Sequence, residues 1–86
     1  MAPSPLELAR AAKEAVAELT GFPPESVSGV QHDDHSWKVT VDVCEVERVP
    51  STTDVLASYV VEFDDDGDLQ GYRRERRFLR GSAEDG

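Results

Sequence analysis

Apolar residues in the first quarter of the chain recur with the spacing of an amphipathic helix. Ser4 is suited to the N-cap, Pro5 to the first helical position, and Glu7 to closing a capping box with Ser4. Gly21 then ends the pattern, and the prolines that follow it prevent its continuation. The sequence therefore predicts a helix over residues 5–20. Its apolar stripe consists of Leu8, Ala12, Ala15, Val16 and Leu19.

From residue 36 onward, apolar residues alternate with polar ones, as they do in half-buried strands. The first run loses this alternation after Cys44, which predicts a β-bulge or a twist near Glu45. The apolar face of the first run is formed by Trp37, Val39, Val41 and Val43. The apolar face of the second run is formed by Val55, Ala57, Tyr59, Val61 and Phe63.

The third run is compatible with two structures. Its residues Tyr72, Arg74, Arg76 and Phe78 alternate as a strand would, whereas Tyr72, Arg76 and Leu79 also fit helical spacing. We expect a strand, because the aspartate-rich segment before it contains Gly67 and is typical of a hairpin turn.

The same turn fixes the expected pairing of the second and third strands. A four-residue loop at 65–68 sets Val61 opposite Tyr72 and Tyr59 near Arg74. This register also sets Val55 opposite Phe78.

These elements predict an α+β fold with one N-terminal helix packed on a three-stranded antiparallel β-meander. We expect a single domain over residues 1–86, with a connection at 21–35, the sheet at about 36–80 and a short flexible tail at 81–86. The expected core comprises Leu8, Val16, Leu19, Trp37, Val39, Val41, Val43 and Val61, with Phe22, Val27 and Val30 of the connection against it. A partly exposed Trp37 would instead indicate a binding hot spot.

The formal net charge of −9 argues against binding to nucleic acid or to anionic membranes. No run of 18 apolar residues is present, so membrane insertion is not expected. The basic residues are concentrated, because five of the nine lie between Arg73 and Arg80. Such a cluster is either a solvated edge that discourages strand aggregation or a docking surface for an acidic partner.

Candidate chemistry is sparse. Cys44 is the only cysteine, which excludes an internal disulfide, and no residue pattern sets His32 or His35 beside it as a base. The cluster at 32–35 has two histidines and two aspartates but no distant fourth ligand, so we expect a solvated loop and no metal site. No phosphate-binding or dinucleotide motif appears. We expect no enzyme activity and no cofactor, and a cytoplasmic location because a signal-peptide pattern is missing.

The segment from Trp37 to Arg77 resembles the gas vesicle protein GvpO family. The family core has the form W-x-V-x-V-E-V-x-E-x-x-R-x-P, then D-x-x-x-x-Y, then D-x-x-G-x-L-x-x-Y-x-R-x-x-R-Y. Asp42 stands where this pattern has Glu, and Phe78 stands where it has Tyr. The matching residues are Trp37, Val39, Val41, Val43, Glu45, Arg48, Pro50, Asp54, Tyr59, Asp64, Gly67, Leu69, Tyr72, Arg74 and Arg77.

The resemblance implies an accessory protein of gas vesicle assembly that contacts other gas vesicle proteins. A main shell subunit is not expected, because this acidic chain with 38% hydrophobic residues lacks large apolar surfaces. A homodimer through a sheet edge is a further expectation. The alternative is a PepSY-like or cystatin-like regulatory or inhibitory module. The expected partner-binding residues are Arg48, Asp54, Tyr59, Tyr72, Arg74 and Arg77.

Overall fold

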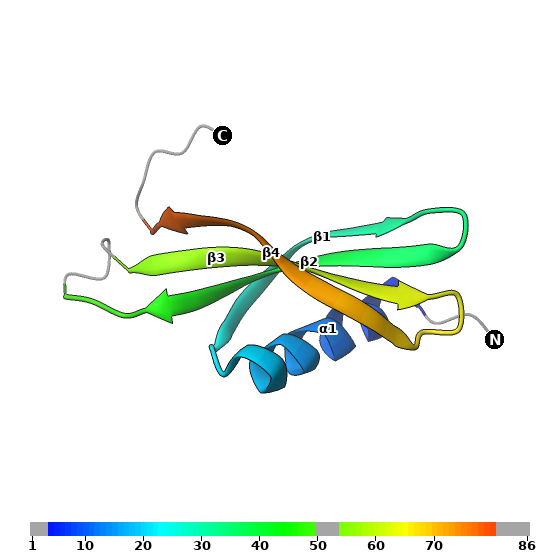
Figure 1. Ribbon diagram of the computed structural model, residues 1–86, viewed down its shortest axis with the longest axis horizontal. Coiled ribbons are helices and arrows are strands. Elements are labelled where there is room, and N and C mark those ends of the chain that lie inside the picture. The colour runs from blue at the N-terminus through cyan, green and yellow to red at the C-terminus, as the bar shows by residue number, and fades with distance from the viewer. Residues whose placement is uncertain (1–3, 50–53, 81–86) are drawn as a thin grey trace.

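A computed structural model describes residues 4–49 and 54–80, which form one helix and one antiparallel sheet (Figure 1). Four strands pair in the order β1-β2-β3-β4, and the sheet is strongly twisted. Pro50 and the expected tail at 81–86 lie outside the described residues. The elements are α1 (Pro5–Thr20), β1 (Pro24–His32), β2 (Ser36–Val46), β3 (Val55–Asp64) and β4 (Leu69–Leu79).

The predicted helix is confirmed, including both of its ends. The Glu7 backbone N–H donates to Ser4 Oγ over 3.1 Å, and the Ser4 N–H donates to Glu7 Oε1 over 3.2 Å. These two bonds form the capping box and satisfy N–H groups that the first turn leaves without a partner. At the other end, Gly21 adopts a left-handed φ of 80°, and its N–H donates to the Ala17 carbonyl.

The expectation of three strands is wrong, because part of the predicted connection forms a fourth strand, β1. Its apolar residues Val27 and Val30 are three positions apart, which hides the period of a strand. A register shift between Val27 and Gly29 explains this spacing, since Val27 pairs with Val41 and Val30 with Val39. Both valines therefore reach the same face and pack against the core.

The predicted bulge near Glu45 is confirmed. Cys44 pairs with Leu56 and Val46 pairs with Val55, so Glu45 has no partner on β3. A bulged residue breaks the alternation of a strand and increases its twist. This is the physical reason for the loss of phase in the sequence after Cys44.

Residues 69–79 form strand β4, which rules out the helical interpretation of this segment. The predicted pairs Val61–Tyr72 and Tyr59–Arg74 are confirmed. The predicted pair Val55–Phe78 is wrong, because Val55 pairs with Leu79. Register shifts between Glu62 and Phe63 and between Ser58 and Tyr59 each leave one residue of β4 without a partner. The second shift moves the pairing of the last residues of β4 by one position.

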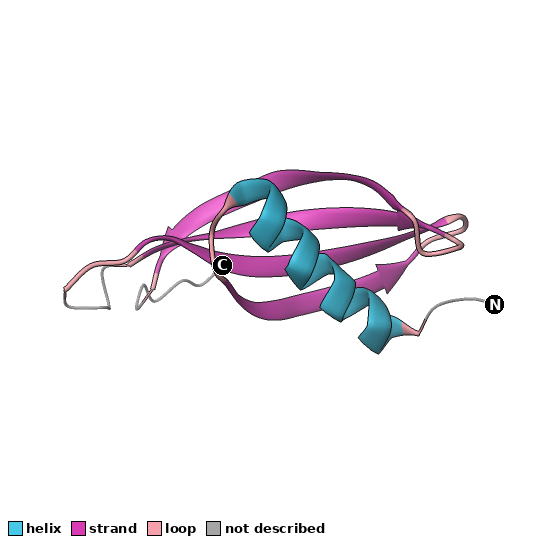
Figure 2. Cartoon of the chain, turned by 90° about the horizontal axis from the view of Figure 1, so that it is seen from below, coloured by secondary structure: helices cyan, strands magenta, loops and turns pink. Residues whose placement is uncertain are grey.

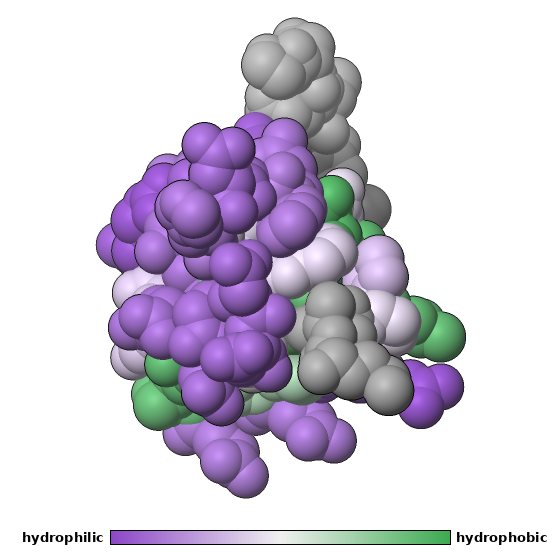
Figure 3. Space-filling view, turned by 90° about the vertical axis from the view of Figure 1, so that its right-hand side faces the viewer, coloured by the Kyte–Doolittle hydropathy of each residue, from purple (hydrophilic) through white to green (hydrophobic). Residues whose placement is uncertain are grey.

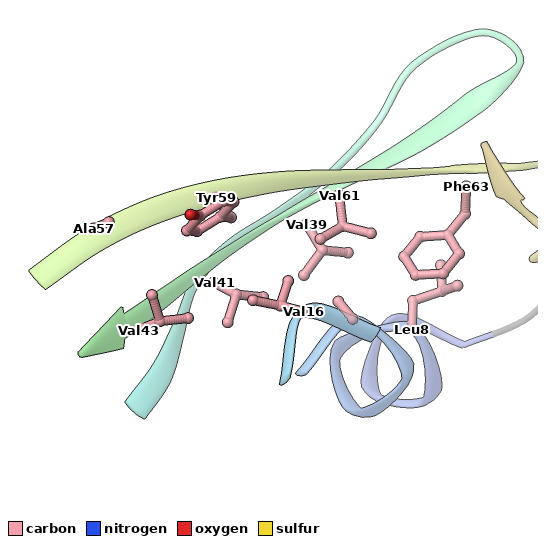
Figure 4. Close-up of a cluster of buried hydrophobic side chains, with 10 residues drawn as sticks. Leu8, Val16, Val39, Val41, Val43, Ala57, Tyr59, Val61 and Phe63 are labelled. Carbon is pink, nitrogen blue, oxygen red and sulfur yellow. The ribbon is translucent and has the colours of Figure 1, made fainter. Parts of the chain in front are cut away.

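The hydrophobic core lies between α1 and one face of the sheet. α1 crosses that face diagonally (Figure 2) and packs mainly on β1 and β2, with fewer contacts to β3. Figure 4 shows the valines of β2 and β3 pointing toward Leu8 and Val16 of the helix. The buried cluster contains Leu8, Ala12, Val16, Val39, Val41, Val43, Ala57, Tyr59, Val61 and Phe63, and Trp37 packs against it while partly buried.

Leu19 does not belong to this core, contrary to the sequence-based prediction. It occupies the same helical stripe as Leu8 and Val16, but 47% of its surface is exposed. Helical spacing places Leu19 on the apolar stripe of α1. Whether its side chain is buried depends on how far the twisted sheet extends beneath the last turn of α1.

Replacement of Leu8 with Ala tests the core. Leu8 is 2% exposed, so we expect the free energy of unfolding to fall by about 2–5 kcal/mol. The matched controls on the same helix are Leu6→Ala and Leu19→Ala, since Leu6 is 64% exposed. Leu6→Ala should change stability by no more than about 0.5 kcal/mol, and Leu19→Ala should cost less than Leu8→Ala. Urea denaturation measures all three, and an equal cost at Leu8 and Leu6 would contradict this packing.

Candidate functional site

The six residues expected to bind a partner form two groups in the structure. The first group lies on the α1 side of β3 and β4 and consists of Tyr59, Tyr72, Arg74 and Arg77. Tyr59 pairs with Arg74, Tyr72 with Val61 and Arg77 with Ala57, so all four share one face of the sheet. Arg48 and Asp54 lie at the end of the sheet where β2 finishes and β3 begins. The two groups have different surroundings.

The first group surrounds the carboxylate of the bulged residue Glu45. Arg77 Nε donates to Glu45 Oε1 over 2.9 Å, and Arg74 Nη1 donates to Oε2 over 3.3 Å. Tyr59 Oη also donates to Oε2 over 3.3 Å. The Glu45 side chain is only 5% exposed, so its charge is neutralised inside the protein by two arginines. We call Glu45, Tyr59, Tyr72, Arg74 and Arg77 the Glu45 cluster.

The two tyrosines of the Glu45 cluster pack against each other. Tyr59 is 8% exposed, and its ring centroid lies 6.2 Å from that of Tyr72, which is 43% exposed. Burial, together with the negative charge of Glu45, raises the pKa of Tyr59, so its hydroxyl stays protonated and donates to the carboxylate.

The arginines of the Glu45 cluster combine fixed positions with access to solvent. The side chains of Arg74 and Arg77 are 46% and 53% exposed. A guanidinium has five N–H donors, and each of these arginines uses one of them on Glu45. The remaining donors belong to side chains that are about half exposed, so they are suited to binding carboxylates of another molecule.

Asp54, one of the residues expected to bind a partner, is held by hydrogen bonds within the domain. It is 5% exposed and accepts the Arg48 backbone N–H at Oδ1 over 2.7 Å and Arg80 Nε at Oδ2 over 3.0 Å. Arg80 Nη2 also donates to Glu25 over 2.6 Å, and the Arg80 N–H donates to the Asp54 carbonyl. These bonds tie β4 to the first residues of β3 and β1. The contribution of Arg48 here is its backbone N–H.

Sequence reasoning did not select Glu45, Arg80 or Glu25 as site residues. The signal for Glu45 was present, because the loss of alternation after Cys44 marks the bulge that turns its side chain toward Arg74 and Arg77. For Arg80 and Glu25 no comparable signal exists, since they are 55 positions apart and meet only through the folded sheet.

The candidate nucleophile and bases lie apart. Cys44 lies near the end of β2, whereas His32 pairs with Trp37 near the start of β2. The seven residues from Trp37 to Cys44 span about 23 Å at 3.3 Å per residue. Burial raises the pKa of the Cys44 thiol, as do the charges of Asp54, Glu25 and Glu47. A raised pKa is the opposite of what a reactive cysteine needs.

The histidines lie at the hairpin end, where hydrophilic residues dominate the surface (Figure 3). His32 stacks on Trp37 with ring centroids 4.2 Å apart. Asp65 lies between the histidines, with its oxygens 3.4 Å from His32 Nε2 and 3.9 Å from His35 Nδ1. In the described ranges, no group of three or more His, Cys, Asp or Glu side chains has an arrangement that could hold a metal ion.

The arginines of β4 are divided between the two faces of the sheet. Arg73 pairs with Val60 and Arg76 with Ser58, which places both on the face opposite α1. Arg73 lies 3.7 Å from Glu62, and Arg76 lies over the Phe78 ring at 4.7 Å. Only Arg74 and Arg77 therefore share the face of the Glu45 cluster.

As for membranes, α1 does not have the length and apolar character to cross one, and it is the only helix in residues 4–49 and 54–80.

Fold and surface together define a small α+β domain with an anchored patch of tyrosine and arginine, a composition typical of protein-binding sites. The sequence profile of the family described as gas vesicle synthesis protein GvpO matches residues 2–84. The chain therefore belongs to the GvpO family. This result agrees with the resemblance that the Trp37–Arg77 motifs indicated.

Curated relatives give the same result. The chain is 48% identical over 82 residues to gas vesicle protein O of Streptomyces sp. (strain CB03234), and 31% identical over 74 residues to gas vesicle protein O1 of Halobacterium salinarum. These alignments cover 95% and 86% of this chain but 64% and 62% of the relatives, so the chain spans less than two thirds of their length. No solved structure shows significant similarity to it.

The Asp54 contacts predict a dependence of stability on pH. The Arg48 backbone N–H and then Arg80 lower the pKa of Asp54 relative to the unfolded chain. Its contribution to stability is therefore fully present above the unfolded pKa of about 4, and it is lost as the pH falls through the lower folded pKa. We expect Asp54→Asn to be less stable than the wild type at pH 7, with a difference that shrinks below about pH 4.

Thermal unfolding followed by circular dichroism between neutral and acidic pH measures this difference. The control is Asp66→Asn, which removes the same charge from an exposed turn position. A difference between wild type and Asp54→Asn that stays constant with pH would contradict the assigned role of the Asp54 carboxylate.

Proposed function

We propose that this protein is an accessory protein of gas vesicle assembly that acts by binding other gas vesicle proteins. It acts without catalysis and is not a main shell subunit. Its place of action is the cytoplasm, at the forming vesicle. Membership of the GvpO family supports the link to gas vesicles.

The observation that carries the proposal is the Glu45 cluster. Arginine and tyrosine are the residues that most often dominate binding energy at protein interfaces, especially when their side chains are held in place before binding. Here a buried carboxylate on β2 fixes two half-exposed arginines of β4 beside an exposed tyrosine. A domain that needed these residues only for solubility would not require such an anchor.

The character of the surface supports an accessory role. A shell subunit needs extended apolar surface for packing against its neighbours. This chain has a net charge of −9, and its exposed large apolar residues are distributed over the helix, β2, β4 and the β2–β3 connection. Strong self-repulsion at this charge favours a protein that stays dispersed until it meets its partner.

The state of the reactive groups supports a role without catalysis. Cys44 is buried with a raised pKa, and the histidines lie at the other end of β2. The surface has a hollow of about 240 Å³ lined by Val60, Glu62, Gly71, Tyr72 and Arg73. A second hollow of about 340 Å³ is lined by Val55, Arg77, Phe78 and Leu79. Neither lining brings together a base and a nucleophile. The PepSY-like or cystatin-like alternative rests on outline alone.

Charge reversal on the α1 side of β4 tests the proposal. We expect Arg74→Glu with Arg77→Glu to remove the bound gas vesicle proteins from a pull-down of the tagged chain in vesicle-forming cells. Loss of one hot-spot residue costs about 2 kcal/mol or more, which is about a thirtyfold loss of affinity. The number of vesicles counted by electron microscopy should fall in parallel.

The matched control is Arg73→Glu with Arg76→Glu, which makes the same charge change on the opposite face of the same strand. Circular dichroism checks whether each variant is folded, and loss of binding counts only for a folded variant. If the wild type captures no gas vesicle protein, the proposed function is wrong. If both double variants keep the same partners as the wild type, the binding surface is misplaced.

Glu45→Gln tests the anchor separately from the arginines. The amide keeps the shape of the side chain but loses the charge that pairs with Arg74 and Arg77. We expect weaker binding of the same partners although both arginines remain. Equal binding by Glu45→Gln and wild type, measured with the purified partner by calorimetry, would show that the orientation of the arginines is unimportant.

A further inference from the structure

α1 leaves part of its own side of the sheet uncovered. The helix packs mainly on β1 and β2, and β4 lies beyond its main contacts. A helix is about 10 Å wide, whereas the backbones of four strands span about 14 Å and their side chains more. In its last turn, Leu19 continues the apolar stripe but is 47% exposed. The uncovered area, which we call the β3–β4 shelf, lies over β3, β4 and the last residue of β2, and it includes the exposed part of the Glu45 cluster.

The β3–β4 shelf carries apolar side chains in register across three strands. Val46 pairs with Val55, and Val55 pairs with Leu79, so the three form one row. Val46 is 38% exposed and Leu79 is 50% exposed. The hollow of about 340 Å³ adjoins this row at the β4 edge. It is lined by Val55, Arg77 and Leu79, and by Phe78, which pairs with Leu56 and belongs to the opposite face. An apolar side chain of a partner would fill it.

Arg74 and Arg77 add a charge requirement to the β3–β4 shelf. Both are held by Glu45, and each has further N–H donors. A partner that covers the apolar row is therefore favoured when it presents carboxylates at its margin, because the remaining N–H donors of both arginines lose water on binding.

An added β-strand does not suit this region. β4 has register shifts on both sides of its central pairs, and four arginines lie along it. Bulges and basic residues at a sheet edge both oppose pairing with another strand. Two copies of β4 in antiparallel pairing would also bring arginines opposite arginines, which is destabilising. Of the two sheet edges through which the expected homodimer could form, the β4 edge is therefore unfavourable.

A second copy of the chain does not supply a suitable helix either. In the part of the chain that the structure describes, α1 is the only helix, and the centre of its apolar stripe is already buried against its own sheet. The occupant that these observations favour is therefore a helix of another protein.

We propose that the β3–β4 shelf binds an acidic amphipathic helix of a partner protein, which lies beside α1 and completes the helical layer. This inference rests on the proposed function and specifies the partner. The bound helix carries apolar residues at i, i+3 or i+4, and i+7 over the Val46–Val55–Leu79 row, with Asp or Glu facing Arg74 and Arg77.

Site-directed photo-crosslinking in vesicle-forming cells tests this inference. The crosslinking residue p-benzoylphenylalanine replaces Leu79 in one variant and Tyr72 in another, since both side chains are exposed on the β3–β4 shelf. The control position is Gln31, which is exposed and pairs with Lys38 on the opposite face of the sheet. Mass spectrometry then identifies the crosslinked peptide.

The expected result is a crosslink from Leu79 and Tyr72, but not from Gln31, to a segment of a gas vesicle protein with helical apolar spacing and acidic flanks. A crosslink to an extended or basic segment, or to a second copy of this chain, would overturn the inference. So would the absence of crosslinks while the pull-down still captures gas vesicle proteins. Failure of the pull-down itself would count against the proposed function.

Charge exchange provides the second measurement. Arg77→Glu should weaken binding about tenfold or more, and replacing the mapped acidic residue of the partner with Lys should restore most of the loss. Leu79→Asp, at a position that is 50% exposed, should weaken binding without unfolding the domain. Normal affinity of Leu79→Asp for the mapped segment would overturn the inference.

Discussion

The bulge at Glu45 is the constraint on which the surface of this domain depends. One residue of β2 without a partner on β3 turns a carboxylate toward the side of the sheet that α1 occupies. There it accepts hydrogen bonds from Tyr59, Arg74 and Arg77, so a single side chain connects three strands. A buried charge is tolerated only while its partners are present. The positions of the two arginines are therefore a consequence of the backbone irregularity.

Two kinds of interaction hold different parts of the sheet. Between α1 and the centre of β2 and β3, valine, leucine and phenylalanine side chains stabilise the fold by leaving water. Beyond the helix, the carboxylates of Glu45 and Asp54 hold the sheet. Glu45 is bound to Arg74 and Arg77 of β4, and Asp54 is bound to Arg80, which follows β4. Polar contacts allow this second region to keep its shape while remaining exposed. The protein thus carries a stable surface that its own helix does not cover.

Most of this fold was predictable from local patterns. The capping box, the Gly21 stop, the break of phase near Glu45 and the central register of β3 with β4 each depend on neighbouring residues. β1 was not predictable in the same way, because its bulge separates Val27 and Val30 by three positions and hides the alternation. The burial of Asp54 and the exposure of Leu19 depend on distant segments, Arg80 in one case and the twist of the sheet in the other. Neither the burial of Asp54 nor the exposure of Leu19 can be predicted from composition or from the spacing of apolar residues.

The anchoring of Arg74 and Arg77 also has a kinetic meaning. A flexible binding loop must be ordered during each encounter, and the entropy of that ordering lowers affinity and slows capture. Here the guanidinium groups already occupy fixed places before any encounter, and the strand beneath them is part of a continuous sheet. In the proposed binding role, association needs little rearrangement on this side. Its speed then depends on diffusion and on the attraction between these arginines and acidic groups of the partner, which makes it sensitive to ionic strength.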